Sequence, residues 1–139
     1  MVQARYQAVL DCAREVLLAV EPKMMAGYLY GGFARGDSGP QSDLDLAVLL
    51  PAGGQLGDKL ALIAALSRCV QRDVDVVNLR EAGLDLTHEV LRDGVKLFDR
   101  DQDQTLAWEA EQMTDYSDFI PRRAALLDMY LREPLRTAP

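Results

Sequence analysis

Two aspartates mark the most apolar run of the chain. Residues 44–50 are all hydrophobic except Asp45, and Asp43 stands directly before them. Successive side chains of a strand point to opposite faces, so a strand here puts Asp43 and Asp45 on one face and Leu44 and Leu46 on the other. The run therefore predicts a strand whose apolar face is buried, and burying that face requires a folded domain with a core.

A glycine pair interrupts the chain just upstream. Residues 28–30 read as a short strand that runs straight into Gly31-Gly32, and residues 36–42 are loop by composition. Glycines let the backbone curl so that N–H groups converge on a phosphate. Arg35 follows within reach, and we expect it to contact a phosphate or to support the turn.

Hydrophobic periodicity predicts the other elements. They are helices over residues 2–20, 56–70 and 84–92, strands over residues 73–79 and 95–98, and a helical segment over residues 103–132. Pro121 is expected to kink or restart that last segment, with Asp118 as the cap.

This mixture of elements predicts an α/β (α+β) fold, with a small mixed sheet of about four strands flanked by helices and a long C-terminal helical segment. We expect one domain over residues 1–139, with a core over about 1–100 and a helical extension over about 101–133.

The charge balance limits the partners. The net charge is −7, which argues against direct binding to nucleic acid because no cationic field attracts phosphate backbones. It does not argue against nucleotides, since Mg²⁺ can bridge carboxylates to phosphates. A basic protein partner is electrostatically favoured.

The sequence also predicts the cellular location and the roles of the two cysteines and the single histidine. The N-terminus lacks the apolar core of a signal peptide and no stretch reaches transmembrane length, so we expect a cytoplasmic protein without membrane association. Cys12 and Cys69 are expected to be reduced thiols in the core. The single histidine, His88, is expected to be structural or on the surface.

A third carboxylate comes from the next predicted strand. Asp75 lies between two valines, so it also points away from the core. Adjacent strands lie about 5 Å apart, so Asp75 could meet Asp43 and Asp45 at one site. Three carboxylates can hold two divalent ions about 3.5–4 Å apart, and Asp75 could serve as ligand, general base or both. Asp73 shares its face, and for it we favour a solvated position.

Singly, these signals have ordinary explanations. A lone D-x-D is usually a solvated pair, and a lone glycine pair is usually only a turn. The ordered combination is more specific. Gly31-Gly32-Phe33-Ala34-Arg35-Gly36 followed by Ser42-Asp43-Leu44-Asp45-Leu46 resembles the G-S-x-A-R-G…S-D-x-D-L signature of the minimal nucleotidyltransferases, in the DNA-polymerase-β-like superfamily.

The resemblance covers residues 24 to about 100 and implies the nucleotidyltransferase fold. It implies Asp43, Asp45 and Asp75 as catalytic and metal-binding residues. It implies a nucleotide-binding set of Gly31, Gly32, Arg35, Gly36 and Ser42. Mg²⁺ is the implied cofactor and ATP the implied substrate.

The C-terminal part of the sequence points to one group within this superfamily. Residues 94–98, the run Tyr116-Ser117-Asp118-Phe119 and the pair Arg122-Arg123 are similar to the antitoxins paired with HEPN-domain ribonuclease toxins. That similarity implies transfer of AMP from ATP to a tyrosine of the cognate toxin, which silences the ribonuclease. The C-terminal helix would then contact the toxin, or it simply covers the sheet.

One residue departs from the signature. The serine after the first glycine is Gly32 here, so a hydroxyl that would bond a phosphate oxygen is absent. Relatives that act on tRNA carry Gly-Gly at this turn, so activity is compatible with the change. Two alternatives stay open: a catalytically weak antitoxin that acts by binding the toxin, and a nucleotidyltransferase acting on a small molecule such as an aminoglycoside.

Overall fold

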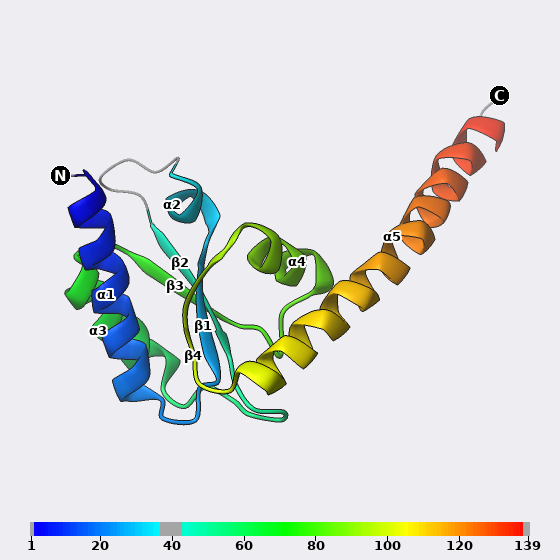
Figure 1. The fold of residues 1–139 in the computed structure, drawn as a ribbon. Helices are drawn as coiled ribbons and strands as arrows, with labels where there is room; N and C mark the ends of the chain where they lie inside the picture. The colour runs from blue at the N-terminus through cyan, green and yellow to red at the C-terminus, as the bar shows by residue number, and fades with distance from the viewer. Residues whose placement is uncertain (1, 37–42, 138–139) are drawn as a thin grey trace.

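The computed structural model describes residues 2–36 and 43–137, in which helices pack on both faces of one sheet (Figure 1). The elements in chain order are α1 (Val2–Val20), β1 (Ala26–Tyr30), α2 (Gly31–Arg35), β2 (Leu44–Leu49), α3 (Lys59–Val70), β3 (Val74–Asn78), α4 (Leu84–Asp93), β4 (Val95–Asp99) and α5 (Gln102–Thr137). The α3 helix begins at Lys59 because the Asp58 side chain accepts the Ala61 N–H at 3.0 Å and caps it.

The strands form a single four-stranded sheet in the order β3-β2-β1-β4. β2 is parallel to β3, whereas β1 is antiparallel to both of its neighbours, β2 and β4. The parallel pair needs a crossover, and α3 supplies it. This arrangement confirms the predicted mixed sheet flanked by helices.

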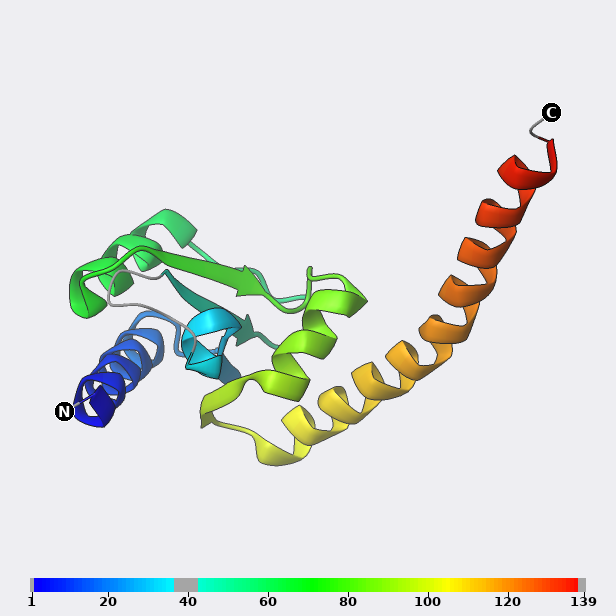
Figure 2. The same ribbon diagram turned by 90° about the horizontal axis from the view of Figure 1, so that it is seen from above.

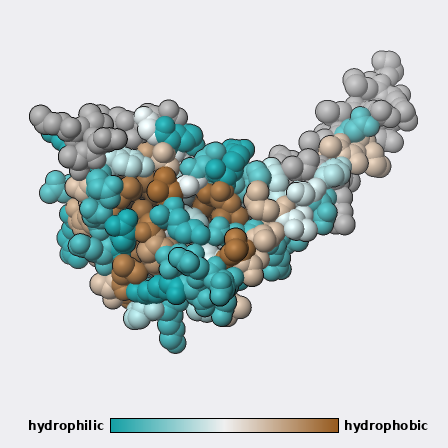
Figure 3. Space-filling model, viewed as in Figure 1, coloured by the Kyte–Doolittle hydropathy of each residue, from teal (hydrophilic) through white to brown (hydrophobic). Residues whose placement is uncertain are grey.

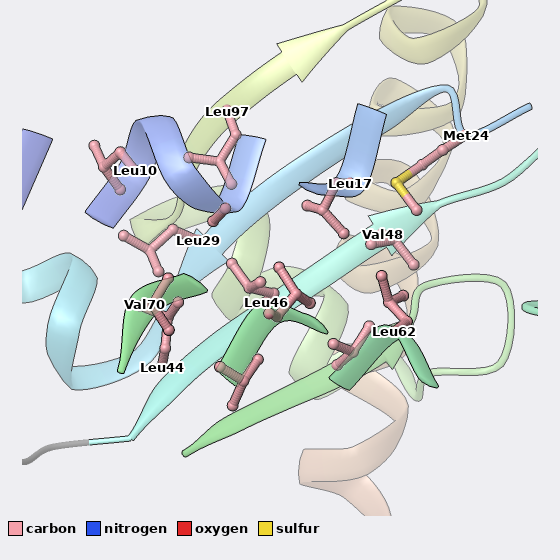
Figure 4. Packing of buried hydrophobic residues seen from close by; sticks show 14 of the residues in the cluster. Leu10, Leu17, Met24, Leu29, Leu44, Leu46, Val48, Leu62, Val70 and Leu97 are labelled. Carbon is pink, nitrogen blue, oxygen red and sulfur yellow. The ribbon is translucent and has the colours of Figure 1, made fainter. Parts of the chain in front are cut away.

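The α1 and α3 helices cover one face of the sheet (Figure 4). On that face Leu29, Leu46 and Val76, one residue from each of three strands, are completely buried. Leu17 of α1 and Leu66 of α3 are equally buried against them. This layer is the larger core cluster, and it leaves the alternate residues of β2 and β3 for the opposite face.

The α4 helix and the start of α5 cover the opposite face, as the view from above shows (Figure 2). Tyr30 and Ala47 of the sheet are buried there with Val90 of α4 and Trp108 of α5. The Arg80 guanidinium lies over the Trp108 ring, 5.9 Å from its centroid. Burying a large apolar side chain contributes roughly 1.5–3 kcal/mol to the free energy of folding, so the buried Trp108 helps to hold the start of α5 on the sheet.

The first turns of α5 are also held by polar contacts. Asp101 caps the helix by accepting a first-turn N–H at 3.3 Å, and the Thr105 hydroxyl donates to Asp99 at 2.9 Å. Lys96 of β4 donates to Glu109 at 2.7 Å. The helix therefore begins where β4 ends and is joined to that strand.

The end of α1 is joined to the same place. Pro22 terminates α1, which leaves carbonyl groups without helical donors. The Arg100 guanidinium donates to the carbonyls of Leu18 at 2.9 Å, Glu21 at 3.0 Å and Pro22 at 2.6 Å. One side chain thus bonds a carbonyl in the last turn of α1 and the two carbonyls of the residues that follow it.

The α5 helix continues well beyond the body of the protein (Figures 1 and 2). It runs unbroken through Asp118 and Pro121, so the predicted restart and cap there are wrong, and the helix bends gently instead. Pro121 is exposed, so water can bond the carbonyl that its ring deprives of a donor. Leu106 and Met113 on this helix are 67 % and 41 % exposed.

The prediction of two reduced cysteines is also wrong. Cys12 of α1 and Cys69 of α3 form a disulfide whose Cα atoms are 6.0 Å apart. The two helices lie side by side on one face of the sheet, and this brings residues 57 positions apart to a separation typical of disulfides. Sequence spacing alone gives no sign of that proximity.

Hydrophilic residues cover most of the surface in the view of Figure 3, with smaller hydrophobic areas between them. Within residues 2–36 and 43–137, no helix combines the length and the apolar character needed to cross a membrane.

Candidate active site

The glycine turn lies at the end of β1. Tyr30 is the last strand residue, and Gly31 begins the single-turn helix α2 with a φ of +77°. A Cβ at Gly31 would overlap Oδ2 of Asp45. Glycine is therefore required both by the backbone conformation and by the close approach of the carboxylate. Gly36 ends α2 with a φ of 78°.

The acidic residues come from the two parallel strands. Asp45 of β2 and Asp75 of β3 are direct partners across the pair, and Asp43 lies two residues before Asp45. Leu44 and Leu46 are completely buried on the opposite face, as the alternation predicted. Asp43 and Asp75 are exposed and Asp45 is half-buried, so the three carboxylates share the sheet face that α4 covers.

These acids interact electrostatically. Burial raises the pKa of Asp45, and the negative charges of Asp75, Asp43 and Glu89 raise it further, while Arg35 lowers it. Neighbouring negative charges disfavour the ionised form of a carboxyl group, and a cation relieves that cost. A positively charged ligand beside Asp45 would therefore favour its ionised form.

The carboxylates are adjacent without forming a closed metal cage. Among the described residues, no three or more histidine, cysteine, aspartate or glutamate side chains converge on a common point that could hold an ion. The backbone brings Asp43, Asp45 and Asp75 to one edge of the sheet, and their role as ligands stays a prediction. Ser42, the remaining member of the predicted nucleotide-binding set, lies outside the described residues.

Two residues near these acids were not predicted. Tyr30 pairs with Asp45 in the register of β1 and β2 and is buried. Burial, followed by the charges of Asp45, Asp75 and Glu89, raises its pKa to about 12, so the hydroxyl stays protonated. The position of Tyr30 directly before Gly31 could have drawn attention to it.

Glu89 is the second. It lies on α4, and its Oε1 is 3.5 Å from Nη1 of Arg35. No sequence signal connects it to the site, because it belongs to an element 44 positions after Asp45 that only the fold brings close.

Asp73, predicted to be solvated, and His88, predicted to be structural or on the surface, are found as predicted. Asp73 is exposed, and its backbone carbonyl accepts the Leu44 N–H at 2.9 Å. The His88 ring stacks on Tyr116 of α5, with centroids 3.8 Å apart and planes within 9°. His88 therefore joins α4 to α5, which is a structural role.

Comparison with known proteins identifies this arrangement. The model of the family described as polymerase beta nucleotidyltransferase matches residues 15–103, a range that contains the glycine turn and all three aspartates. The chain belongs to this family. It is accordingly a nucleotidyltransferase, and the resemblance in the motif is confirmed.

Relatives within the family are more specific. Over 107 residues the chain is 30% identical to protein adenylyltransferase MntA of Shewanella oneidensis, covering 77% of this chain and 76% of that protein. A crystal structure of a toxin–antitoxin with AMP-PNP is similar, with a TM-score of 0.75 and 27% identity over 88% of this chain and 98% of the other. The toxin–antitoxin MntA–HepT matches with a TM-score of 0.72 and 25% identity, over 90% and 98%.

Proposed function

We propose that this nucleotidyltransferase is an antitoxin that transfers AMP from ATP to a tyrosine of a cognate HEPN ribonuclease toxin and thereby neutralises it. The observation that carries the proposal is the pairing of Asp45 with Asp75, with Asp43 two residues away, beside the Gly31 turn. The adenylyltransferase relative and the toxin–antitoxin structures support it. We place the reaction in the cytoplasm, where ATP is available.

The chemistry assigns each part of the site a role. The tyrosine oxygen of the toxin attacks the α-phosphorus of ATP, the bond from that phosphorus to the β-bridging oxygen breaks, and pyrophosphate leaves. Gly31, Gly32 and Gly36 leave room for the triphosphate, with Arg35 supplying positive charge. Asp75 accepts the phenolic proton.

The acid set fits magnesium. Asp43, Asp45 and Asp75 offer the hard carboxylate oxygens that Mg²⁺ prefers. Burial raises the pKa of Asp45, and neighbouring negative charges, which a cation would neutralise, raise it further. Bound Mg²⁺ would stabilise charge on the attacking and leaving oxygens. The described acids do not enclose a point by themselves, which suits an ion that also takes phosphate oxygens and water.

The direct test is transfer of label. The toxin is incubated with the protein, Mg²⁺ and ATP carrying ³²P at the α-phosphorus, and label on the toxin is followed. Asp43→Ala and Asp45→Asn are expected to lower the rate at least about a hundredfold. Asp73→Asn is the matched control, since this exposed aspartate lies beside β3 outside the acid set. Absence of label from the wild type, or an unchanged rate in Asp43→Ala, contradicts the proposal.

One observation favours a second function. Gly32 removes the hydroxyl that the family serine offers to a phosphate oxygen, which favours an antitoxin that neutralises by binding alone. In cells that express the toxin, Asp45→Asn separates the two functions. Continued protection by this variant supports binding alone. Loss of protection while the complex still co-purifies supports catalysis.

A further inference from the structure

We propose that Glu89 is a positioning residue for nucleotide binding, because it holds the Arg35 guanidinium over the glycine turn. The inference rests on the proposed function, since it concerns the same nucleotide site. It assigns a role to α4, an element outside the motif that carries the resemblance.

The guanidinium of Arg35 lies between α4 and the turn. Its Nη1 is 3.5 Å from Oε1 of Glu89, and its Nη2 is 4.0 Å from the place where a Cβ on Gly32 would stand. Arg35 also lowers the pKa of Asp45, so its charge reaches the acid set. A guanidinium has five N–H donors in a fixed fork, so one edge can bind a carboxylate while another faces a phosphate.

Glu89 is itself held in place by its neighbours on α4. Thr87 and Val90 are 2 % and 1 % exposed, and Val90 packs in the core cluster on the face of the sheet that α4 covers. The ring of His88 stacks on Tyr116 of α5. With the residues before and after it fixed, Glu89 is directed toward α2, where the pair with Arg35 forms.

The pair is accessible to a ligand. The Arg35 and Glu89 side chains are 44 % and 38 % exposed. An ion pair this open adds little to the stability of the fold, so stability alone does not account for an acid beside the phosphate site. A negative charge there also repels a triphosphate. The carboxylate of Glu89 is explained if it holds Arg35 in the orientation that binds phosphate.

Repulsion of the nucleotide by Glu89 and positioning of Arg35 by Glu89 predict opposite changes in nucleotide affinity when Glu89 is replaced by alanine. If Glu89 acts only through its charge, Glu89→Ala and Glu89→Gln both remove repulsion and tighten nucleotide binding. If it positions Arg35, Glu89→Ala weakens binding, and Glu89→Gln retains part of the affinity because its amide oxygen, although uncharged, can accept a hydrogen bond from Nη1.

The experiment measures binding of the magnesium complex of α,β-methylene-ATP by calorimetry, because this analogue cannot transfer AMP. Glu89→Ala is expected to raise Kd about two- to fivefold, the range for one exposed ion pair. In the Arg35→Ala background the same substitution is expected to add no weakening. The control is Glu111→Ala, which removes one exposed negative charge from α5.

Three outcomes overturn the inference: tighter binding in both Glu89 variants, unchanged binding in Glu89→Ala, or weakening by Glu89→Ala that persists without Arg35. A thermal melt of each variant verifies folding. With toxin and ATP, Glu89→Ala is expected to raise KM for ATP and to leave kcat within about twofold. The wild type is measured first, so failure of the wild type to bind nucleotide rejects the proposed function itself and not only the role of Glu89.

Discussion

Gly31 approaches the carboxylate of Asp45 so closely that a Cβ on the glycine would overlap Oδ2. The contact joins the turn after β1 to the acid of β2, and the two strands are paired at this point through Tyr30 and Asp45. The turn and the acid thus set each other's position, and a change in one should affect both folding and catalysis.

Gly31→Ala tests this contact. The new methyl group must enter a left-handed backbone conformation and displace Asp45, so we expect a loss of about 2 kcal/mol or more in the free energy of unfolding and at least about a tenfold lower rate of AMP transfer. Urea unfolding and the labelling assay measure the two effects. Gly32→Ala is the matched control, because a Cβ there meets only Nη2 of Arg35 at 4.0 Å. Equal stability of the two variants would contradict the finding.

Gly32→Ser tests the departure from the family signature. The space around Gly32 is open enough for a side chain, so the substitution should fold normally. A hydroxyl that donates to a phosphate oxygen is worth about 1 kcal/mol, so KM for ATP should fall about fivefold. Gly32→Ala lacks the hydroxyl and should show no gain. If both variants have the wild-type KM, the missing serine does not limit this protein.

Asp45→Asn tests the electrostatics of the acid set. The folded state raises the pKa of Asp45, so its contribution to stability is present below the ordinary aspartate pKa of about 3.9 and is lost as pH rises through the folded value. In EDTA at pH 7 we therefore expect Asp45→Asn to melt at a higher temperature than the wild type, with a gap that shrinks toward pH 3. Adding Mg²⁺ should also narrow the gap. A difference in melting temperature that does not change with pH would exclude the raised pKa of Asp45 as its cause.

The disulfide between Cys12 and Cys69 gives a prediction for the opposite face of the sheet. A disulfide between residues 57 positions apart restricts the conformations of the unfolded chain. The free energy of unfolding should therefore be about 2–4 kcal/mol larger for the oxidised protein than for the reduced one. Urea unfolding with and without dithiothreitol measures the difference. The Cys12→Ser/Cys69→Ser double variant should match the reduced wild type and be insensitive to reductant. Two reactive thiols in the folded, non-reduced protein would contradict the pairing.

The strands and the acid set could be predicted because their signals are local. Leu44 and Leu46 alternate with Asp43 and Asp45, and that period alone assigns two faces to β2. Asp75 needed one further assumption, that its strand lies beside β2, and the parallel register of the two strands satisfies it.

The features that sequence reasoning missed depend on distances between elements. Cys12 and Cys69 gave no local sign of the packing of α1 on α3, and Glu89 reaches Arg35 only because α4 lies over the carboxylate face. Pro121 misled for a different reason. A proline inside a helix removes one hydrogen bond and its ring crowds the carbonyl one turn earlier, and at the exposed Pro121 water can bond that carbonyl, which lessens the cost.

The bonds from Arg100 to the end of α1 have a mechanical consequence for the protruding arm formed by α5. The α5 helix starts two residues after Arg100, whose side chain is bound to the end of α1 in the opposite layer of the molecule. Lys96 then binds Glu109, about two turns into the helix. A force applied along the arm is therefore resisted by both layers at once. We expect nuclear-magnetic-relaxation measurements to show the body and the first turns of the arm tumbling as one elongated particle, with no pivot where they join.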